Sequence, residues 1–219
     1  MIGDVNSTDQ KGPSRMTNEA GDLTPVANYL YEMGYLKRVP RTGWLIAGVQ
    51  NPESIAEHSF RAAIIGMVLA HLEGADPAKT AMLCLLHDTQ ETRIGDVPSV
   101  GKAYVTTVDN PSVTADQVAG FPAALASALV SLVTEYEGRE SPESILARDA
   151  DKLECLLQAR EYLATGHEDV PPWIETSAAA VRSVSGKRLA ELCQQVAPKD
   201  WWAAAAAAYP RPQRPSRDS

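Results

Sequence analysis

Apolar residues recur at intervals close to one helical turn along most of the chain, and no segment shows the strict alternation that is typical of a β-strand. The segment 52–72 is the clearest example, with apolar side chains at Ile55, Phe60, Ala63, Ile64, Met67 and Val68. Residues 77–91, entered through Asp76-Pro77, are almost entirely apolar as far as His87, which is typical of a central helix. The pattern predicts an all-α protein.

Further helices are expected over residues 25–35, 114–136, 141–165, 172–196 and, in the sequence PKDWWAAAAAAY, 198–209. The first would begin with Thr24 as its N-cap and Pro25 at the first helical position. A long loop, GDVPSVGKAYVTTVDNPSV, follows the central helix.

The chain has 219 residues, which is enough for one sizeable core. Residues 1–22 are polar and rich in Gly, Ser, Asn and Asp, and residues 210–219 are rich in Pro and Arg. Both compositions are typical of disordered segments. We therefore expect a single helical bundle over 23–209, flanked by a disordered tail at each end.

Acidic residues outnumber basic ones, and the formal net charge is −8 with no basic block. The charge argues against a nucleic acid polymer as partner, although a single nucleotide can still bind through a metal ion. Residues 1–22 lack the features of a signal peptide, and no apolar run approaches the ~20 residues that span a bilayer. Three cysteines, Cys84, Cys155 and Cys193, lie in apolar helical contexts without CxxC spacing. We expect a cytoplasmic protein that has reduced core cysteines and does not associate with membranes.

The candidate chemistry lies where the central helix turns acidic, in AMLCLLHDTQETRIGDVPS at 81–99. This stretch carries His87, Asp88, Glu91 and Asp96. Buried charged groups are stable only when they are paired or bind a metal. Local sequence alone also permits a simpler interpretation, in which His87 caps the helix and Asp88 forms an ion pair elsewhere.

Two other predicted helices contribute polar groups from core-forming segments. His58 lies on the helix at 52–72, and Asp149 and Asp151 lie in ARDADKLECLLQAREY. Two imidazoles and two carboxylates from three helices would bind one divalent cation and leave positions for water and phosphate oxygens. Asp149 and Asp151 point about 200° apart on a helix, so only one of them can face the metal, and periodicity does not decide which.

Four segments, LKRVPRTGW, VQNPESIAEHSFRAA, LLHDTQETRIGDVPS and DADKLECLLQAREY, occur in this order within residues 25–165. Together they resemble the HD-domain metal-dependent phosphohydrolases, in particular the 5′-deoxynucleotidase branch that includes the HD-domain-containing protein 2 type. The resemblance implies an all-α HD-domain bundle, a homodimer and one divalent metal ion per chain, without distinguishing Mn, Co, Fe, Ni, Zn or Mg. It implies that the metal ligands are His58, His87, Asp88 and Asp151, and so selects Asp151 over Asp149.

The resemblance also implies roles for the two remaining carboxylates. Glu91 would orient or deprotonate the attacking water, and Asp96 would line the pocket near the sugar and influence the preference for deoxyribose. Local sequence alone would predict that Glu91 is a carboxylate at a helix end, paired with Arg93, and that Asp96 is a turn residue.

Substrate-binding residues follow the family pattern less closely. Bacterial 5′-deoxynucleotidases carry an Arg-Trp pair that binds phosphate and sugar; here Trp44 matches the tryptophan, but Gly43 occupies the arginine position. Arg41, two residues earlier, is the candidate replacement, and Arg61 is a further candidate for the phosphate. Without a role in substrate binding, Trp44 would be a residue of the core and Arg41 a charge on the surface.

These features predict hydrolysis of a nucleoside 5′-monophosphate, 2′-deoxy or modified, by metal-activated water. One alternative is an alarmone-type pyrophosphohydrolase, but HDTQET has Thr92 where those enzymes carry Asp. The other is a non-catalytic nucleotide-binding HD module, which the presence of Glu91 beside a complete ligand set disfavours.

Overall fold

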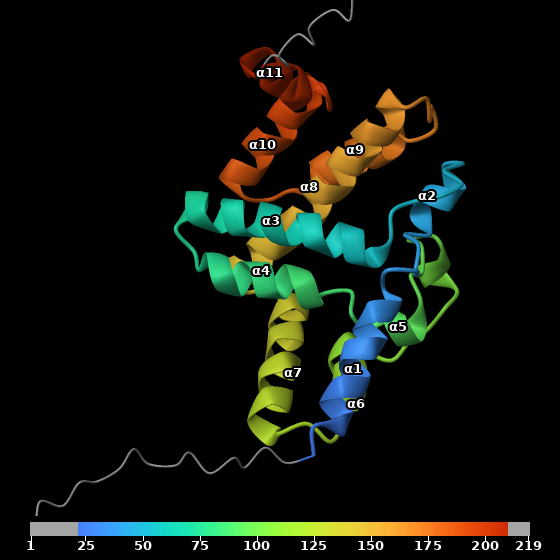
Figure 1. The fold of residues 1–219 in the computed structure, drawn as a ribbon, viewed down its shortest axis with the longest axis vertical. Coiled ribbons are helices and arrows are strands. Elements are labelled where there is room, and N and C mark those ends of the chain that lie inside the picture. The colour runs from blue at the N-terminus through green and yellow to red at the C-terminus, as the bar shows by residue number, and fades with distance from the viewer. Residues whose placement is uncertain (1–21, 210–219) are drawn as a thin grey trace, which may run out of the picture.

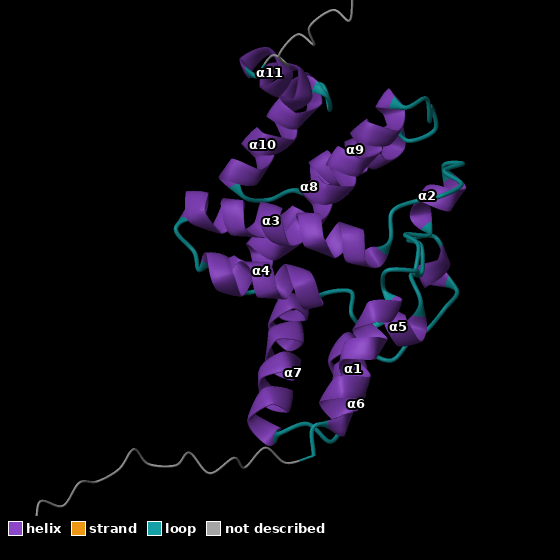
Figure 2. Cartoon of the chain, in the orientation of Figure 1, coloured by secondary structure: helices purple, strands orange, loops and turns teal. Residues whose placement is uncertain are grey.

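The structure, a computed structural model, describes residues 22–209, and these form helices joined by short connections without a strand (Figure 2). The all-α prediction is confirmed. The predicted tails, apart from Asp22, lie outside the described residues. In chain order the helices are α1 (Thr24–Tyr35), α2 (Gly43–Ile46), α3 (Ile55–Glu73), α4 (Pro77–Leu86), α5 (Glu91–Ile94), the 3-10 helix η1 (Gly101–Ala103), α6 (Asn110–Gln117), α7 (Ala123–Gly138), α8 (Pro142–Ala164), α9 (Pro171–Ala180), α10 (Val184–Gln195) and α11 (Asp200–Ala208).

Helices α3, α4 and α8 form the centre of the fold, and each packs against the other two (Figure 1). Helices α9 and α10 cover one side of α8, and α7 packs on α4 and α8. Gly66 on α3 allows the close approach of α4, because a Cβ atom at this position would lie 2.6 Å from the Cys84 Sγ atom. This tight arrangement brings polar side chains of three helices into one buried region.

The start of α3 is fixed by a capping box, which places it three residues later than predicted. The Ser54 side chain accepts a hydrogen bond from the Glu57 backbone N–H, and the Glu57 carboxylate accepts one from the Ser54 N–H at 2.7 Å. These bonds satisfy two backbone donors that the first turn leaves free. The helix therefore begins at Ile55, and Pro52 lies in the preceding loop.

Large apolar residues on α3 identify the helix but not its buried face. Its buried positions carry mostly small residues, among them Ala62, Gly66 and Ala70. A stripe of larger apolar side chains is exposed instead: Phe60, Ile64, Met67, Val68 and Leu72. Part of the periodicity that predicted this helix therefore belongs to an outward surface.

Three other predicted boundaries are corrected. The predicted helix 77–91 ends at Leu86, and α5 begins after a turn. The predicted helix 114–136 is divided near Gly120, whose φ of 85° is unfavourable for other residues, and Pro122. The predicted helix 172–196 is divided between α9 and α10 at Val181, whose backbone is extended. At the first helix, Leu23 is the N-cap in place of Thr24.

Within the described residues, α3 is the one helix whose length and composition would allow it to cross a membrane. The expectation that no apolar segment reaches this length is therefore wrong for α3. In this structure 44% of its apolar window is buried within the chain, as in the core helix of a globular protein.

Candidate metal centre and active site

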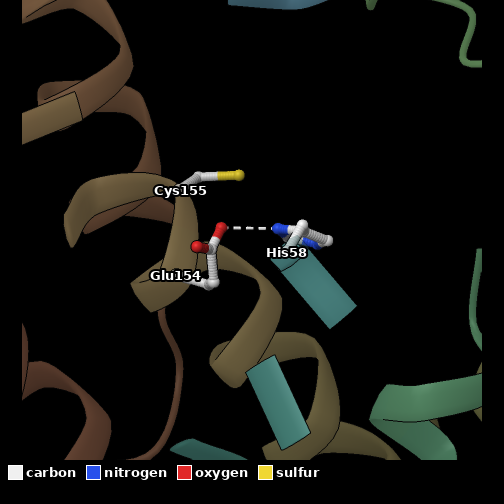
Figure 3. Close-up of side chains that lie close together, drawn as sticks. All are labelled: His58, Glu154 and Cys155. Carbon is white, nitrogen blue, oxygen red and sulfur yellow. Dashed lines mark hydrogen bonds and ion pairs between the residues drawn. The ribbon is translucent and has the colours of Figure 1, made fainter. Parts of the chain in front are cut away.

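His58, on the second turn of α3, is fully buried, and its two ring nitrogens have different surroundings. The Nδ1 atom lies 2.5 Å from Oε2 of Glu154 on α8. Figure 3 marks this contact with a dashed line. The carboxylate accepts the Nδ1 proton, so the Nε2 atom, on the opposite side of the ring, is the nitrogen that can bind a metal. That side faces His87 and Asp151.

His87 is oriented by its own helix. It is the C-cap of α4, and its Nδ1–H donates to the backbone carbonyl of Cys84 at 2.6 Å. The Nε2 atom is again the ring nitrogen that can face a metal. The two Nε2 atoms lie 3.4 Å apart. At this distance they need a proton or a metal ion between or beside them, and a metal would take the place of the Nε2 proton of His58.

Two carboxylates complete this group. Asp88 Oδ2 lies 3.0 Å from His87 Nε2, and Asp151 Oδ1 lies 3.3 Å from His58 Nε2. The remaining imidazole–carboxylate separations are 3.9 and 4.0 Å. Two imidazole nitrogens and two carboxylate oxygens are a donor set that suits divalent first-row metals. The four predicted ligands therefore come together, and their chemistry fits one divalent ion.

A second group that shares His58 is a poorer metal site. Its members are His58, Glu154 and Cys155 (Figure 3). At 2.5 Å, Nδ1 and Oε2 share a proton in a short hydrogen bond and lie closer together than two separate ligands of one tetrahedral ion. Burial raises the pKa of the Cys155 thiol to about 12, so the sulfur stays protonated. The Nε2 side of His58 is therefore the better candidate for a metal.

The choice between Asp149 and Asp151 is decided by backbone partners. Both carboxylate oxygens of Asp149 accept hydrogen bonds from backbone N–H groups, from Arg182 at 2.9 Å and from Ser183 at 2.7 Å. Asp149 therefore secures the connection between α9 and α10. Asp151 faces the imidazoles with one oxygen, and its other oxygen pairs with Lys152 at 2.9 Å.

The centre holds its negative charge despite burial. Burial alone would raise the pKa of Asp88, but His87 and Arg41 hold it well below its usual range. Burial opposes ionisation of Asp151 in the same way, and its hydrogen bond with His58 and the charge of Lys152 outweigh that effect. Burial and Arg41 lower the pKa of His58, but Asp151 and Glu154 raise it to about 10. This part of the protein stabilises positive charge.

A cavity of about 1070 Å³ opens beside the ligands. His87, Asp88 and Asp151 lie on its wall, together with Arg41, Trp44 and Glu91. Its volume is at the upper end of the range for small-molecule sites, so a nucleotide fits within it. A phosphate bound there would lie against the metal ligands.

Glu91 is the carboxyl group in this cavity that best suits proton transfer. Its Oε2 atom is buried and has no hydrogen-bond partner among the described residues. Burial, followed by repulsion from Asp88 and Asp96, raises its pKa to about 9. The alternative pairing with Arg93 is wrong, because Arg93 binds Glu32 of α1 at 2.8 Å.

Arg41 and Trp44 come from the loop before α3 and the short helix α2. Arg41 donates to Asp88 Oδ2 at 2.9 Å, so it is part of the centre and not a surface charge. Trp44 is 2% exposed and donates from Nε1 to Glu53 at 2.9 Å. It packs against Tyr162 and Trp173, and forms an aromatic wall of the cavity. Sequence reasoning missed Trp173.

Asp96 lines the cavity and also fixes the loop that carries Arg41. Its Oδ2 atom accepts a hydrogen bond from the Thr42 backbone N–H at 2.6 Å, and its carbonyl accepts one from the Thr42 hydroxyl at 2.9 Å. The partner, Thr42, was not identified from the sequence, since nothing local links positions 54 residues apart.

The prediction that Arg61 binds the phosphate is corrected, because Arg61 does not line this cavity. Its guanidinium binds Glu154 at 2.7 Å, Gln158 at 2.8 Å and Glu161 at 2.8 Å, all on α8. Every nitrogen of the group has an acceptor in these contacts. Arg61 borders a separate cavity of about 490 Å³. Sequence reasoning also missed Glu154, whose spacing from Asp151 gave no sign of its contact with His58.

Comparison with known proteins finds HD-domain proteins and 5′-deoxynucleotidases as relatives. The family model described as "HD domain" matches residues 33–196. The chain is 33% identical to 5′-deoxynucleotidase HDDC2 of Homo sapiens over 64% of its length and 69% of that protein. It is 30% identical to 5′-deoxynucleotidase hdd1 of Schizosaccharomyces pombe over 66% of its length and 75% of that protein. A solved structure from Pyrococcus horikoshii OT3 has 34% sequence identity and a TM-score of 0.64, and the match covers 77% of this chain and 96% of that one.

Proposed function

Because this chain belongs to the HD-domain family, we propose that it is a metal-dependent phosphohydrolase that removes the 5′-phosphate from nucleoside monophosphates, 2′-deoxy or modified. The observation that carries the proposal is the convergence of His58, His87, Asp88 and Asp151, the last three of which lie on the wall of a nucleotide-sized cavity. The proposed cofactor is one divalent ion per chain.

The four ligands would hold the ion by two Nε2 atoms and two carboxylate oxygens. When bound, a divalent ion supplies a Lewis acid for a phosphate oxygen and lowers the pKa of water. The low pKa values of Asp88 and Asp151 keep both carboxylates ionised at neutral pH, so these two ligands need no deprotonation, whereas His58, whose pKa is raised to about 10, must release its Nε2 proton when the ion binds.

The remaining residues bind the nucleotide and handle the proton. Glu91, with its unpartnered Oε2 atom, orients the attacking water. Its raised pKa keeps it protonated at neutral pH without a metal, and a divalent ion in the centre would favour the ionised form that accepts the proton of the water. Arg41, already within 2.9 Å of Asp88, contacts the phosphate and takes the part of the arginine absent at Gly43. Trp44 and Asp96 bound the space for the nucleoside.

The proposed protein is a homodimer in the cytoplasm. A homodimer would cover the exposed apolar stripe on α3, which a protein in water otherwise leaves hydrated. The three cysteines are free, as suits the reducing cytoplasm. A nucleic acid polymer is not expected, given the net charge of −8.

The residue at position 92 argues against the alternative of an alarmone pyrophosphohydrolase. Thr92 stands where those enzymes carry an acidic residue, and its hydroxyl donates to Glu32 at 2.7 Å. Thr92 is also absent from the cavity wall. The residue after Glu91 therefore serves packing between α1 and α5.

The test is phosphate release from a panel of ribo-, 2′-deoxy- and modified nucleoside 5′-monophosphates. The protein is assayed after chelation and after reloading with Mn²⁺, Co²⁺, Zn²⁺ or Mg²⁺. We expect release only after reloading, and faster release from the deoxy or modified members. Equal rates in chelated and reloaded protein would reject the proposal. Tight nucleotide binding without turnover would favour a non-catalytic module, and pyrophosphate release from a guanosine tetraphosphate would favour the alarmone alternative.

A further inference from the structure

We propose that Glu154 and Arg61 are positioning residues, which hold the His58 imidazole in the tautomer and orientation that the metal needs. The proposal rests on the proposed function, because it assigns the metal to the Nε2 side of His58. Figure 3 shows the carboxylate of Glu154 directed at the His58 ring from α8.

Glu154 uses each oxygen for a different partner. Oε2 faces His58 Nδ1 at 2.5 Å, and Oε1 accepts from the Arg61 Nε and NH2 groups at 2.9 and 2.7 Å. Glu154 and His58 are both fully buried. A carboxylate held in this way on both sides has one orientation, and only an Nδ1–H on His58 satisfies it.

Arg61 fixes the other side of this carboxylate. Its guanidinium pairs with Oε1 of Glu154 at 2.7 Å and is itself held on α8 by Gln158 and Glu161. Arg61 lies on α3, three residues after His58, so imidazole and guanidinium bind the same carboxylate from one helix face. The contact joins α3 to α8 next to Asp151, another ligand.

The second imidazole has no such dependence on a side chain. His87 donates from Nδ1 to a backbone carbonyl of its own helix, which no substitution of a side chain removes. The orientation of His58 instead depends on a residue 96 positions away. Outer partners of this kind commonly change metal affinity or activity by 10–100-fold.

The experiment compares Glu154→Gln with Glu161→Gln. Glutamine has the same shape, but only the oxygen of its amide accepts hydrogen bonds. Its NH₂ group donates, so the amide cannot accept from both Arg61 and the His58 N–H. Glu161 also binds Arg61 and lies on α8, but its side chain is 45% exposed and is not a partner of His58. It is therefore the matched control.

Metal affinity is measured first, by calorimetry with Mn²⁺ and Co²⁺ on chelator-treated full-length protein. We expect Glu154→Gln to weaken binding by about 10-fold or more and Glu161→Gln by less than about 2-fold. A second measurement follows the His58 Nδ1 proton by ¹⁵N–¹H NMR in the Zn²⁺-loaded protein. Its resonance should be strongly shifted in the wild type and move in Glu154→Gln only.

Arg61→Lys provides the second variant if Glu154→Gln does not fold. It keeps the charge but loses the paired N–H donors, and should weaken metal binding by several-fold. Wild-type affinity and an unmoved His58 resonance in a folded Glu154→Gln or Arg61→Lys would overturn the inference and leave the proposed function intact. If the wild type itself does not bind either metal, both proposals fail.

Discussion

Replacing Glu91 by glutamine should raise the stability of the metal-free protein at neutral pH while it removes most of the catalytic activity. Burial and the nearby Asp88 and Asp96 raise the pKa of Glu91 to about 9, against an ordinary value of 4.5. Between these values the native protein binds a proton that the unfolded chain has released. The contribution of Glu91 to stability is therefore fully present below pH 4.5 and falls as the pH rises towards 9.

The size of this effect follows from the shift. At pH 7 the unfolded chain is 2.5 pH units above the ordinary pKa, which corresponds to a cost of about 3 kcal/mol at 1.36 kcal/mol per unit. The cavity wall leaves Glu91 partly hydrated, and a buried glutamine amide without a partner costs about 1 kcal/mol. We therefore expect a net gain of about 1–2 kcal/mol for Glu91→Gln at pH 7 and no gain at pH 4.5.

Catalysis should change in the opposite direction. Loss of a group that accepts the proton of water lowers kcat by about 10²–10⁴-fold, which corresponds to about 3–5 kcal/mol of the activation barrier. Metal affinity should stay close to the wild type, because Glu91 is not among the four ligands.

The assay combines urea unfolding of chelated protein at pH 4.5 and pH 7 with phosphate release from the metal-loaded enzyme. Glu32→Gln on α1 is a control for loss of a carboxylate outside the cavity, and it should lower stability because Glu32 binds Arg93. A Glu91→Gln protein that is less stable than wild type at pH 7, or that retains kcat, would refute the assignment of Glu91.

Four further substitutions test other parts of the structure. Asp149→Asn should lower stability by about 2–4 kcal/mol with little change in metal affinity, whereas Asp151→Asn should abolish tight metal binding; the reverse pattern by calorimetry and urea unfolding would exchange their roles. Arg41→Ala should raise KM for the nucleotide more than it lowers kcat in steady-state assays, and an unchanged KM would remove it from the phosphate site. Gly66→Ala should lower the free energy of unfolding by about 1–3 kcal/mol, because its Cβ atom meets the Cys84 sulfur at 2.6 Å; an unchanged Tm would show that α3 and α4 adjust freely.

Sequence patterns were sufficient for the helical class and for the central helices, because their signals are local. Repeated apolar positions predicted a helix over 52–72, close to the observed α3, and Pro142 and Ala164 bound the observed α8 close to the predicted 141–165. Boundaries were less predictable where side chains compete with the backbone. The break after Ala180 coincides with backbone N–H groups that bind Asp149, a partner that lies far away in the sequence.

The residues of the site were likewise predictable only in part. Position along the chain and the family resemblance named four ligands, and the structure brings these four together. Glu154 and Thr42 act through contacts 96 and 54 residues away, which a single sequence does not reveal. Arg61 was misassigned for the same reason, since a guanidinium that can bind phosphate can also bind the carboxylates of a neighbouring helix.

Diffraction from crystals grown with Mn²⁺ or Co²⁺ tests the metal centre most directly. The structure predicts one anomalous peak per chain, within bonding distance of the Nε2 atoms of His58 and His87 and of the carboxylates of Asp88 and Asp151. A peak at the His58 Nδ1 side, between Glu154 and Cys155, or the absence of any peak near these imidazoles, would contradict it.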